Sequence, residues 1–121
     1  MNMSFHAQGG LSDTVTLDDY LIENKESSYM LRVKGNSMKD AGIVDGDMVI
    51  VERASSARPG EIVVADIDGE HTLKYYREKS GGAGSRAQIY LEPANPAHSA
   101  MYPKEYLNIE AVVRAVFRKY Q

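Results

Sequence analysis

Two residues of this chain have the chemistry and the local sequence for nucleophilic catalysis, Ser37 and Lys74. Ser37 follows a tight Gly35-Asn36 turn and begins an expected helical turn, which projects its hydroxyl outward. The backbone N–H groups at Asn36, Ser37 and Met38 are then placed to hold a developing oxyanion. A serine hydroxyl is a weak nucleophile at neutral pH, so this chemistry also requires a base.

Lys74 is the candidate base. It lies in an expected strand and shares a face with Glu70, Thr72 and Tyr76. An unperturbed lysine has a pKa near 10.4, so only about 0.04% of it is neutral at pH 7. Burial disfavours the ammonium form and can make lysine a competent general base. Ser–Lys pairs that work in this way are a known variant of the serine-hydrolase mechanism.

Simpler interpretations compete with this one. Ser37 precedes Asp40 at capping-box spacing and Gly42 can end a helical turn, so the serine hydroxyl is alternatively a helix cap. A strand lysine is ordinarily a solvated charge. Histidine is the usual base, but His71 lies beside a turn and His98 lies in a loop without an orienting carboxylate. Both are therefore expected to be surface histidines.

The composition of the 121 residues excludes several other classes of site. The chain has no cysteine, which excludes disulfides and thiolate chemistry, and its three scattered histidines form no ligand pair. We therefore expect no metal and no cofactor. The net charge of -3 does not favour a phosphate-binding surface. No apolar run approaches the roughly 20 residues that span a bilayer, and no signal peptide is evident. A single cytoplasmic domain without membrane contact is expected.

The elements that must position these residues are mostly strands. Alternating or continuous apolar residues predict strands at 29–33, 48–51, 62–67, 70–76, 88–91 and 109–120. Asp68-Gly69, between two of these runs, favours a type I′ hairpin turn. Thr16 and Asp19 match a capping box that begins a short helix. The predicted fold is mainly β, a compact domain of twisted antiparallel sheets with one or two short helical turns.

The last expected strand predicts a homodimer through residues 109–120. One face carries Ile109, Ala111, Val113, Ala115 and Phe117, and the other carries Glu110, Val112, Arg114, Val116 and Arg118. At a sheet edge, unpaired backbone groups would invite a second chain, and two-fold pairing would match Glu110 with Arg114 or Arg118. Val112→Glu is then expected to yield a monomer. The alternative is an internal strand whose charges are solvated.

Three segments in order resemble the self-cleaving LexA/UmuD family, peptidase family S24. They are VKGNSMKDAGI at 33–43, Asp45-Gly46-Asp47, and DGEHTLK at 68–74, and the resemblance extends through Leu91-Glu92-Pro93-Ala94-Asn95 to the C-terminus. In that family the serine of G-x-S-M-x-x-x-G-I is the nucleophile and the lysine of D-G-E-x-T-x-K is its base. The resemblance therefore implies these roles for Ser37 and Lys74.

The resemblance also implies a biological setting. It implies a LexA/UmuD-type catalytic domain over residues 16–121, preceded by a flexible segment 1–15 that is a remnant of the linker and cleavage loop. This serine endopeptidase would cut an upstream bond in its own chain when stimulated by a RecA filament in the bacterial SOS response to DNA damage. Cleavage would end repression by a LexA-like transcription regulator or activate a UmuD-like polymerase partner. DNA would be reached only through an absent N-terminal domain or through that polymerase.

Two alternatives to an active self-cleaving domain remain. Family members cut an Ala-Gly or Cys-Gly bond before the serine, whereas the Ala-Gly pairs of this chain, at 41–42 and 83–84, follow it. A processed UmuD′-like, non-enzymatic polymerase accessory module is the first alternative. A signal-peptidase-like protease is the second, although it would need a membrane anchor that this sequence lacks.

Overall fold

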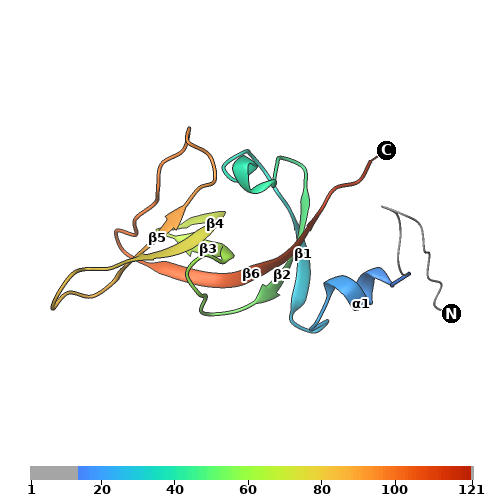
Figure 1. Ribbon diagram of the computed structural model, residues 1–121, viewed down its shortest axis with the longest axis horizontal. Coiled ribbons are helices and arrows are strands. Elements are labelled where there is room, and N and C mark those ends of the chain that lie inside the picture. The colour runs from blue at the N-terminus through green and yellow to red at the C-terminus, as the bar shows by residue number, and fades with distance from the viewer. Residues whose placement is uncertain (1–13, 121) are drawn as a thin grey trace, which may run out of the picture.

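The computed structural model describes residues 14–120 and is mainly β, as predicted (Figure 1). A single antiparallel sheet has the strand order β1-β2-β6-β3-β4-β5. In chain order the elements are α1 (Leu17–Leu21), β1 (Ser28–Arg32), the 3-10 turn η1 (Lys39–Ala41), β2 (Met48–Arg53), β3 (Ile62–Ile67), β4 (Glu70–Lys79), β5 (Gln88–Glu92) and β6 (Leu107–Phe117).

The β3–β4 hairpin forms around the predicted Asp68-Gly69 turn. Both residues have positive φ, 50° and 90°, as a type I′ turn requires. The Asp68 carboxylate also accepts hydrogen bonds from the backbone N–H groups of residues 104–106, at 2.8, 2.8 and 3.0 Å. These hydrogen bonds lower the pKa of Asp68. The turn therefore holds the 104–106 segment against the hairpin that carries Lys74.

The prediction that the last strand forms a sheet edge is wrong. β6 lies inside the sheet, paired with β2 over residues 111–117 and with β3 over residues 107–112. It is the long strand that joins the two halves of the sheet in Figure 1. Toward either end of β6, each residue is paired with a strand on one side only, because β3 does not extend past residue 112 and β2 does not extend before residue 111.

Two β-bulges in β6 break the predicted alternation of faces. Each bulge inserts one residue, Glu110 opposite β3 and Arg114 opposite β2, and so moves the following residues to the other face. The register pairs Val64 with Ala111 and Ala65 with Ile109, and Ile50 with Ala115 and Val51 with Val113.

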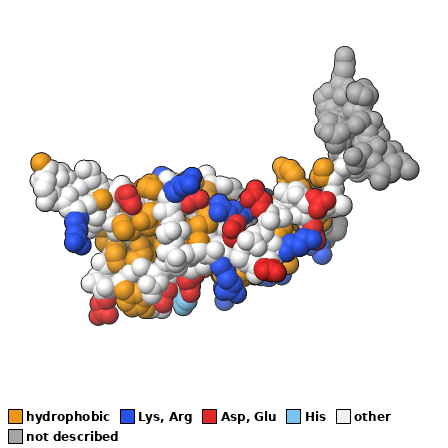
Figure 2. All heavy atoms as spheres, turned by 90° about the horizontal axis from the view of Figure 1, so that it is seen from below, with side chains coloured by type: hydrophobic (Ala, Val, Ile, Leu, Met, Phe, Trp, Pro, Cys, Tyr) orange, Lys and Arg blue, Asp and Glu red, His pale blue; other side chains and the backbone are white. Residues whose placement is uncertain are grey.

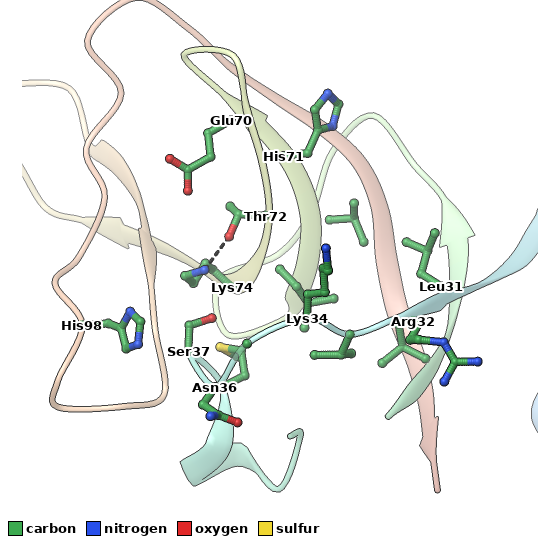
Figure 3. A pocket seen from close by; sticks show the side chains of 16 residues that line it. Leu31, Arg32, Lys34, Asn36, Ser37, Glu70, His71, Thr72, Lys74 and His98 are labelled. Carbon is green, nitrogen blue, oxygen red and sulfur yellow. Dashed lines mark hydrogen bonds between the residues drawn. The ribbon is translucent and has the colours of Figure 1, made fainter. Parts of the chain in front are cut away.

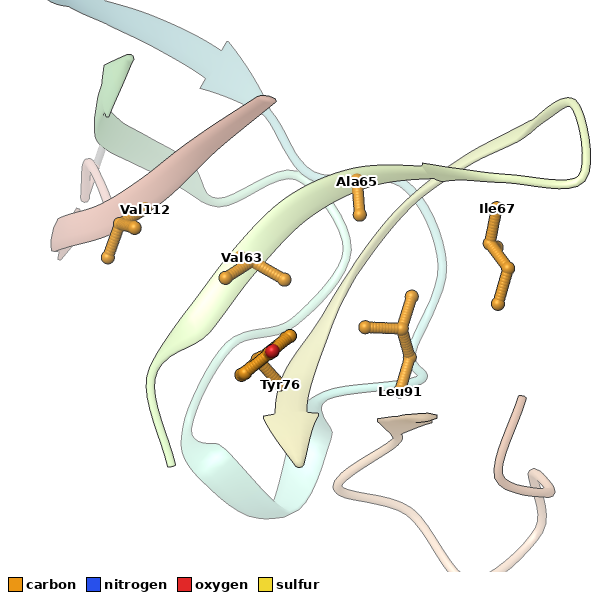
Figure 4. Packing of buried hydrophobic residues seen from close by; sticks show 6 residues of the cluster. All are labelled: Val63, Ala65, Ile67, Tyr76, Leu91 and Val112. Atoms are coloured by element: carbon orange, nitrogen blue, oxygen red, sulfur yellow. The ribbon is translucent and has the colours of Figure 1, made fainter. Parts of the chain in front are cut away.

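The core consists of two apolar clusters on opposite faces of the sheet. Figure 4 shows one of them, formed by Val63, Ala65, Ile67, Tyr76, Leu91 and Val112. The other is formed by Met38, Ile43, Val49, Val51 and Ala111. Val112 is only 3% exposed. A glutamate at that position would bury an unpaired charge, so Val112→Glu would unfold the chain instead of separating two copies.

Helix α1 is capped as predicted but is not buried. The Asp19 N–H donates to Thr16 Oγ1 at 3.2 Å. Leu17 and Tyr20 nevertheless remain 77% and 75% exposed. Most of the predicted flexible segment 1–15 lies outside the described residues. Within residues 14–120, no helix is long and apolar enough to cross a membrane.

Charges of both signs are interspersed on the surface. Figure 2 shows one face of the molecule, on which acidic and basic side chains alternate along much of its length. Hydrophobic side chains gather on the same face toward the end away from the grey segment. This face presents no continuous basic stripe of the kind that grips a nucleic-acid backbone.

Candidate active site

Ser37 and Lys74 line one cleft of about 500 Å³, between the segment that follows β1 and the start of β4. In Figure 3 the Ser37 and Lys74 side chains lie on the same side of the cleft, and Thr72 lies beside the Lys74 amine. The apolar wall of the cleft comes from both halves of the sheet and consists of Leu31, Val33, Met38, Val49, Val64 and Leu73. Folding thus brings together the two residues that the sequence analysis selected.

The turn that carries Ser37 is anchored by its buried neighbours. Met38 and Ile43 are each 2% exposed and pack in the second core cluster. Gly42 ends the 3-10 turn with a φ of 81°, a left-handed conformation that favours glycine. The N-cap residue is Met38 and its side chain makes no capping hydrogen bond. Ser37 is therefore not a helix cap, and the capping interpretation is wrong.

Lys74 is buried, with 7% of its surface exposed. Its amine donates a hydrogen bond to Thr72 Oγ1, which lies two residues earlier on the same face of β4. Burial lowers the pKa of Lys74, and the Glu70 carboxylate offsets part of that effect. The alternative of a solvated strand lysine is therefore wrong. A buried amine of lowered pKa is suited to accept a proton.

The expected oxyanion donors are available. In the described part of the chain, the backbone N–H groups of Asn36, Ser37 and Met38 donate to no protein acceptor. The Asn36 side chain makes a different contact, in which its Oδ1 accepts a hydrogen bond from the Asp45 N–H at 3.4 Å. Asp45 Oδ1 in turn accepts the Gly35 N–H at 2.7 Å. These contacts fold the 35–45 segment back on itself around Ser37.

Both histidines border the cleft, but neither is hydrogen-bonded to Ser37 among residues 14–120. His71 Nδ1 lies 2.9 Å from Glu110 Oε1, and the His71 side chain is 64% exposed. His98 lines the side of the cleft formed by the 93–98 loop. Over the same residues, no group of three or more His, Asp or Glu side chains is arranged to hold a metal ion.

Sequence reasoning missed an ion pair between the buried Asp47 and the half-exposed Arg118, next to the serine turn. Asp47, 1% exposed, accepts Arg118 Nε at 2.6 Å and Arg118 Nη2 at 2.7 Å, and it also accepts the Val44 N–H at 2.9 Å. The Arg118 hydrogen bond, helped by the Val44 N–H, lowers the pKa of Asp47 to about 2. The Asp45-Gly46-Asp47 motif was a signal, because a buried aspartate requires a partner.

The residues of the expected inter-subunit charge matching also have partners within the chain. Arg118 is used by Asp47 within the chain, Glu110 contacts His71, and Arg114 contacts Glu52 at 3.2 Å.

Two further residues next to the dyad escaped the sequence analysis. Thr72 appeared only as a neighbour on the strand face, and Asn95 only as part of a motif. Asn95 is 8% exposed, and its Nδ2 donates to the Asn36 carbonyl oxygen at 2.8 Å. A buried asparagine in a loop was the available signal, since such a side chain requires hydrogen-bond partners.

Comparison with known proteins gives one consistent result. The family model described as Peptidase S24-like matches residues 3–115. A LexA repressor of Desulfitobacterium hafniense is 42% identical over 113 residues, covering 93% of this chain and 51% of that protein. A LexA repressor of Methylococcus capsulatus is 46% identical over 101 residues, covering 81% of this chain and 46% of that protein. The chain thus spans about half the length of these relatives.

Proposed function

The chain belongs to the Peptidase S24-like family, and from this membership and the geometry of the cleft we propose that it is a Ser–Lys endopeptidase. Ser37 is the nucleophile, Lys74 is the general base, and the N–H groups of Asn36, Ser37 and Met38 support the oxyanion. One observation carries the proposal: a buried lysine of lowered pKa lines the same cleft as a serine hydroxyl that caps no helix.

The proposed reaction is peptide hydrolysis in two steps. The neutral Lys74 amine takes the Ser37 hydroxyl proton as Oγ bonds to the substrate carbonyl carbon. The tetrahedral oxyanion collapses, the C–N bond breaks, and the leaving amine receives the proton from Lys74. Water, deprotonated by the same amine, then hydrolyses the ester and frees Ser37. Thr72 accepts a hydrogen bond from Lys74 and so orients its amine.

An extended peptide is the substrate that this cleft fits best. β5 pairs with β4 only from Tyr75 onward, so the Glu70–Lys74 stretch of β4 has no strand on that side in residues 14–120. Such an open edge can add a substrate segment by backbone hydrogen bonding. The apolar wall beside it would receive alternate side chains of that segment.

The relatives named LexA repressor support a role in repression. We propose that the bond cut lies in the protein's own chain, that an activated RecA filament stimulates cleavage, and that cleavage ends repression in the SOS response. We propose that these 121 residues do not themselves bind DNA, in keeping with the net charge of -3. We also propose a homodimer through the C-terminal end of β6.

Covalent labelling by a fluorophosphonate tests the proposed nucleophile. Reaction with wild-type protein is expected to release one equivalent of fluoride from the reagent and to leave one phosphonyl adduct on the protein, mapped to Ser37 by mass spectrometry. Ser37→Ala should abolish the adduct and keep the fold, because its hydroxyl makes no capping bond. The exposed Ser85→Ala variant is the matched control and should label normally. Equal labelling of Ser37→Ala and wild type would remove Ser37 from the mechanism.

Incubation with a RecA filament tests the proposed stimulation of cleavage. Incubation of the protein with RecA, single-stranded DNA and a nucleoside triphosphate is expected to yield two fragments from wild type and none from Ser37→Ala. If purified protein labels at Ser37 but never cleaves with RecA, the peptidase proposal stands and the SOS assignment falls.

A further inference from the structure

The loop after β5 is hydrogen-bonded to both peptide groups that flank Ser37. Asn95 Nδ2 donates to the Asn36 carbonyl oxygen at 2.8 Å, and the Ala94 N–H donates to the Ser37 carbonyl oxygen at 2.8 Å. The Asp40 N–H donates back to the Ala94 carbonyl oxygen at 2.8 Å. Three short hydrogen bonds thus join two loops that are more than fifty residues apart in sequence.

These contacts set the direction of the catalytic N–H groups. In a trans peptide the C=O and the following N–H point in opposite directions. The described chain has no cis peptide bond, so the Asn36 carbonyl opposes the Ser37 N–H and the Ser37 carbonyl opposes the Met38 N–H. Because both carbonyls point at residues 94–95, both N–H groups point away from that loop, where they have no protein acceptor among residues 14–120.

Asn95 is itself held in a single orientation. Its Oδ1 accepts the Ala97 N–H at 2.9 Å, and its own carbonyl oxygen accepts the His98 N–H at 3.0 Å. The side chain is nearly buried, so water cannot readily replace its Nδ2 donor at the Asn36 carbonyl. The Lys39 N–H also reaches that carbonyl, at 3.2 Å, but it belongs to the serine turn itself.

We propose that Asn95 is a positioning residue that aims the oxyanion-binding N–H groups of Ser37 and Met38. This inference rests on the proposed peptidase function and adds a role for the 93–98 loop. Asn95 touches neither the substrate nor Lys74 in this role. Losing its Nδ2 donor should therefore slow reactions that develop an oxyanion and spare reactions at the nucleophile that develop none.

The absence of cysteine makes this distinction measurable. In a Ser37→Cys protein, the single thiol can react in two ways. Iodoacetamide alkylates it with loss of iodide and forms no oxyanion. p-Nitrophenyl acetate acylates it through a tetrahedral oxyanion and releases p-nitrophenolate. The ratio of the two rate constants, measured from pH 6 to 10, separates oxyanion support from thiolate formation.

Adding Asn95→Ala to Ser37→Cys is expected to lower the acylation rate about 10- to 100-fold, while alkylation stays within about twofold, with an unchanged pH midpoint. Asn24→Ala, which changes an exposed asparagine in the segment between α1 and β1, is the matched control and should change neither rate. Asn95→Leu keeps the volume without the donor and should repeat the Asn95→Ala result if that variant proves poorly folded by circular dichroism.

Each outcome has a distinct meaning. Equal losses in alkylation and acylation, or a shifted pH midpoint, would show a general structural role and overturn the proposal. Unchanged acylation in both Asn95 variants would also overturn it, leaving the Ser–Lys site intact. If Ser37→Cys acylates no faster than a free cysteine peptide while Asn95 is present, the proposed catalytic site itself fails.

Discussion

Lys74 can serve as a base only because the fold removes its amine from water. A charged amine loses hydration when it is buried, and Thr72 alone cannot replace several water molecules. The cost of burying the Lys74 charge must therefore appear in the free energy of unfolding as well as in the reaction rate. The folded-state pKa of Lys74 is lowered, so in this region of pH the unfolded chain binds more protons than the folded chain.

Lys74→Met isolates this contribution. Below the folded-state pKa, the wild type carries a buried charge that the variant lacks, so the variant should have the higher free energy of unfolding. As pH rises from the folded-state pKa toward the unfolded value near 10.4, the cost of the charge disappears and the difference should shrink. Urea unfolding of both proteins between pH 6 and 10 measures it. A difference that is constant with pH would show that Lys74 does not titrate abnormally.

The rate of the serine reaction should also depend on the protonation state of Lys74. Fluorophosphonate labelling by the wild type is expected to accelerate as pH rises through the folded-state pKa of Lys74, because the neutral amine is the active form. Lys74→Arg should label at least about 100-fold more slowly at every pH, since a guanidinium does not deprotonate in this range. Lys79→Arg, on the exposed end of the same strand, is the control. An active Lys74→Arg protein would assign the base to another residue.

At the scale of elements, the Asp47–Arg118 ion pair ties the end of β6 to the loop that carries Ser37. Arg118 also donates to the Gly42 carbonyl oxygen at 3.2 Å, where the 3-10 turn ends. Removing Arg118 would leave the Asp47 carboxylate buried without its cation. The serine turn should loosen before the sheet does.

Arg118→Met is expected to lower the melting temperature at pH 7, whereas Lys119→Met, at the exposed neighbouring position, should leave it unchanged. The pKa of Asp47 is lowered to about 2 when Arg118 is present. The stabilisation that the ion pair contributes is therefore complete above the unfolded-state pKa of Asp47, near 3.9, and is lost as pH falls toward 2. Thermal unfolding from pH 2 to 7 should show the two proteins converging at the acid end. A constant gap down to pH 2 would argue against this ion pair as the cause.

The β3–β4 turn offers a second test at this scale. Gly69 has a φ of 90°, which an alanine adopts only with strain, although a Cβ there would meet Tyr106 Oη at an ordinary 3.9 Å. Gly69→Ala should therefore destabilise the protein by about 1 kcal/mol or more through backbone conformation alone. Gly69→Asn, a residue that tolerates positive φ, should recover part of the loss. Equal melting temperatures for wild type and Gly69→Ala would contradict the turn assignment.

At the scale of the whole molecule, the proposed dimer depends on the part of β6 that β3 does not reach. Beyond Val112, β6 is paired only with β2 in the described chain. Val116 is 39% exposed there and borders a groove shared with Tyr20 and Leu21. An open strand edge next to exposed apolar side chains can accept a second copy.

Val116→Glu is the variant that tests the dimer, because Val112 belongs to the core. Sedimentation at micromolar concentration is expected to give twice the chain mass of 13.4 kDa for wild type and the single mass for Val116→Glu. Met30→Glu, which changes an exposed methionine on β1, tests whether any added charge on the outer half-sheet has this effect. A wild type that stays at the single mass at all concentrations would rule out the dimer.

Local signals were sufficient for much of this protein. Apolar periodicity located the strands, Asp68-Gly69 indicated the β3–β4 turn, and Thr16 indicated the start of α1. Each of these features depends on residues close together in the chain. The residue types around Ser37 and Lys74 suggested a dyad but left capping and a solvated lysine open. The family resemblance, and not local spacing, chose between them at that point.

Only the tertiary structure decided the rest. Whether Lys74 is buried, which carboxylate of the chain pairs with Arg118, and whether Asn95 reaches the serine turn all depend on partners distant in sequence. The position of β6 also depends on distant partners, because its apolar pattern suits either an edge or an interior strand. Its two bulges occur where it pairs with β2 and with β3. Desolvation and long-range hydrogen bonding are properties of the assembled neighbours, so no window of sequence around one residue contains them.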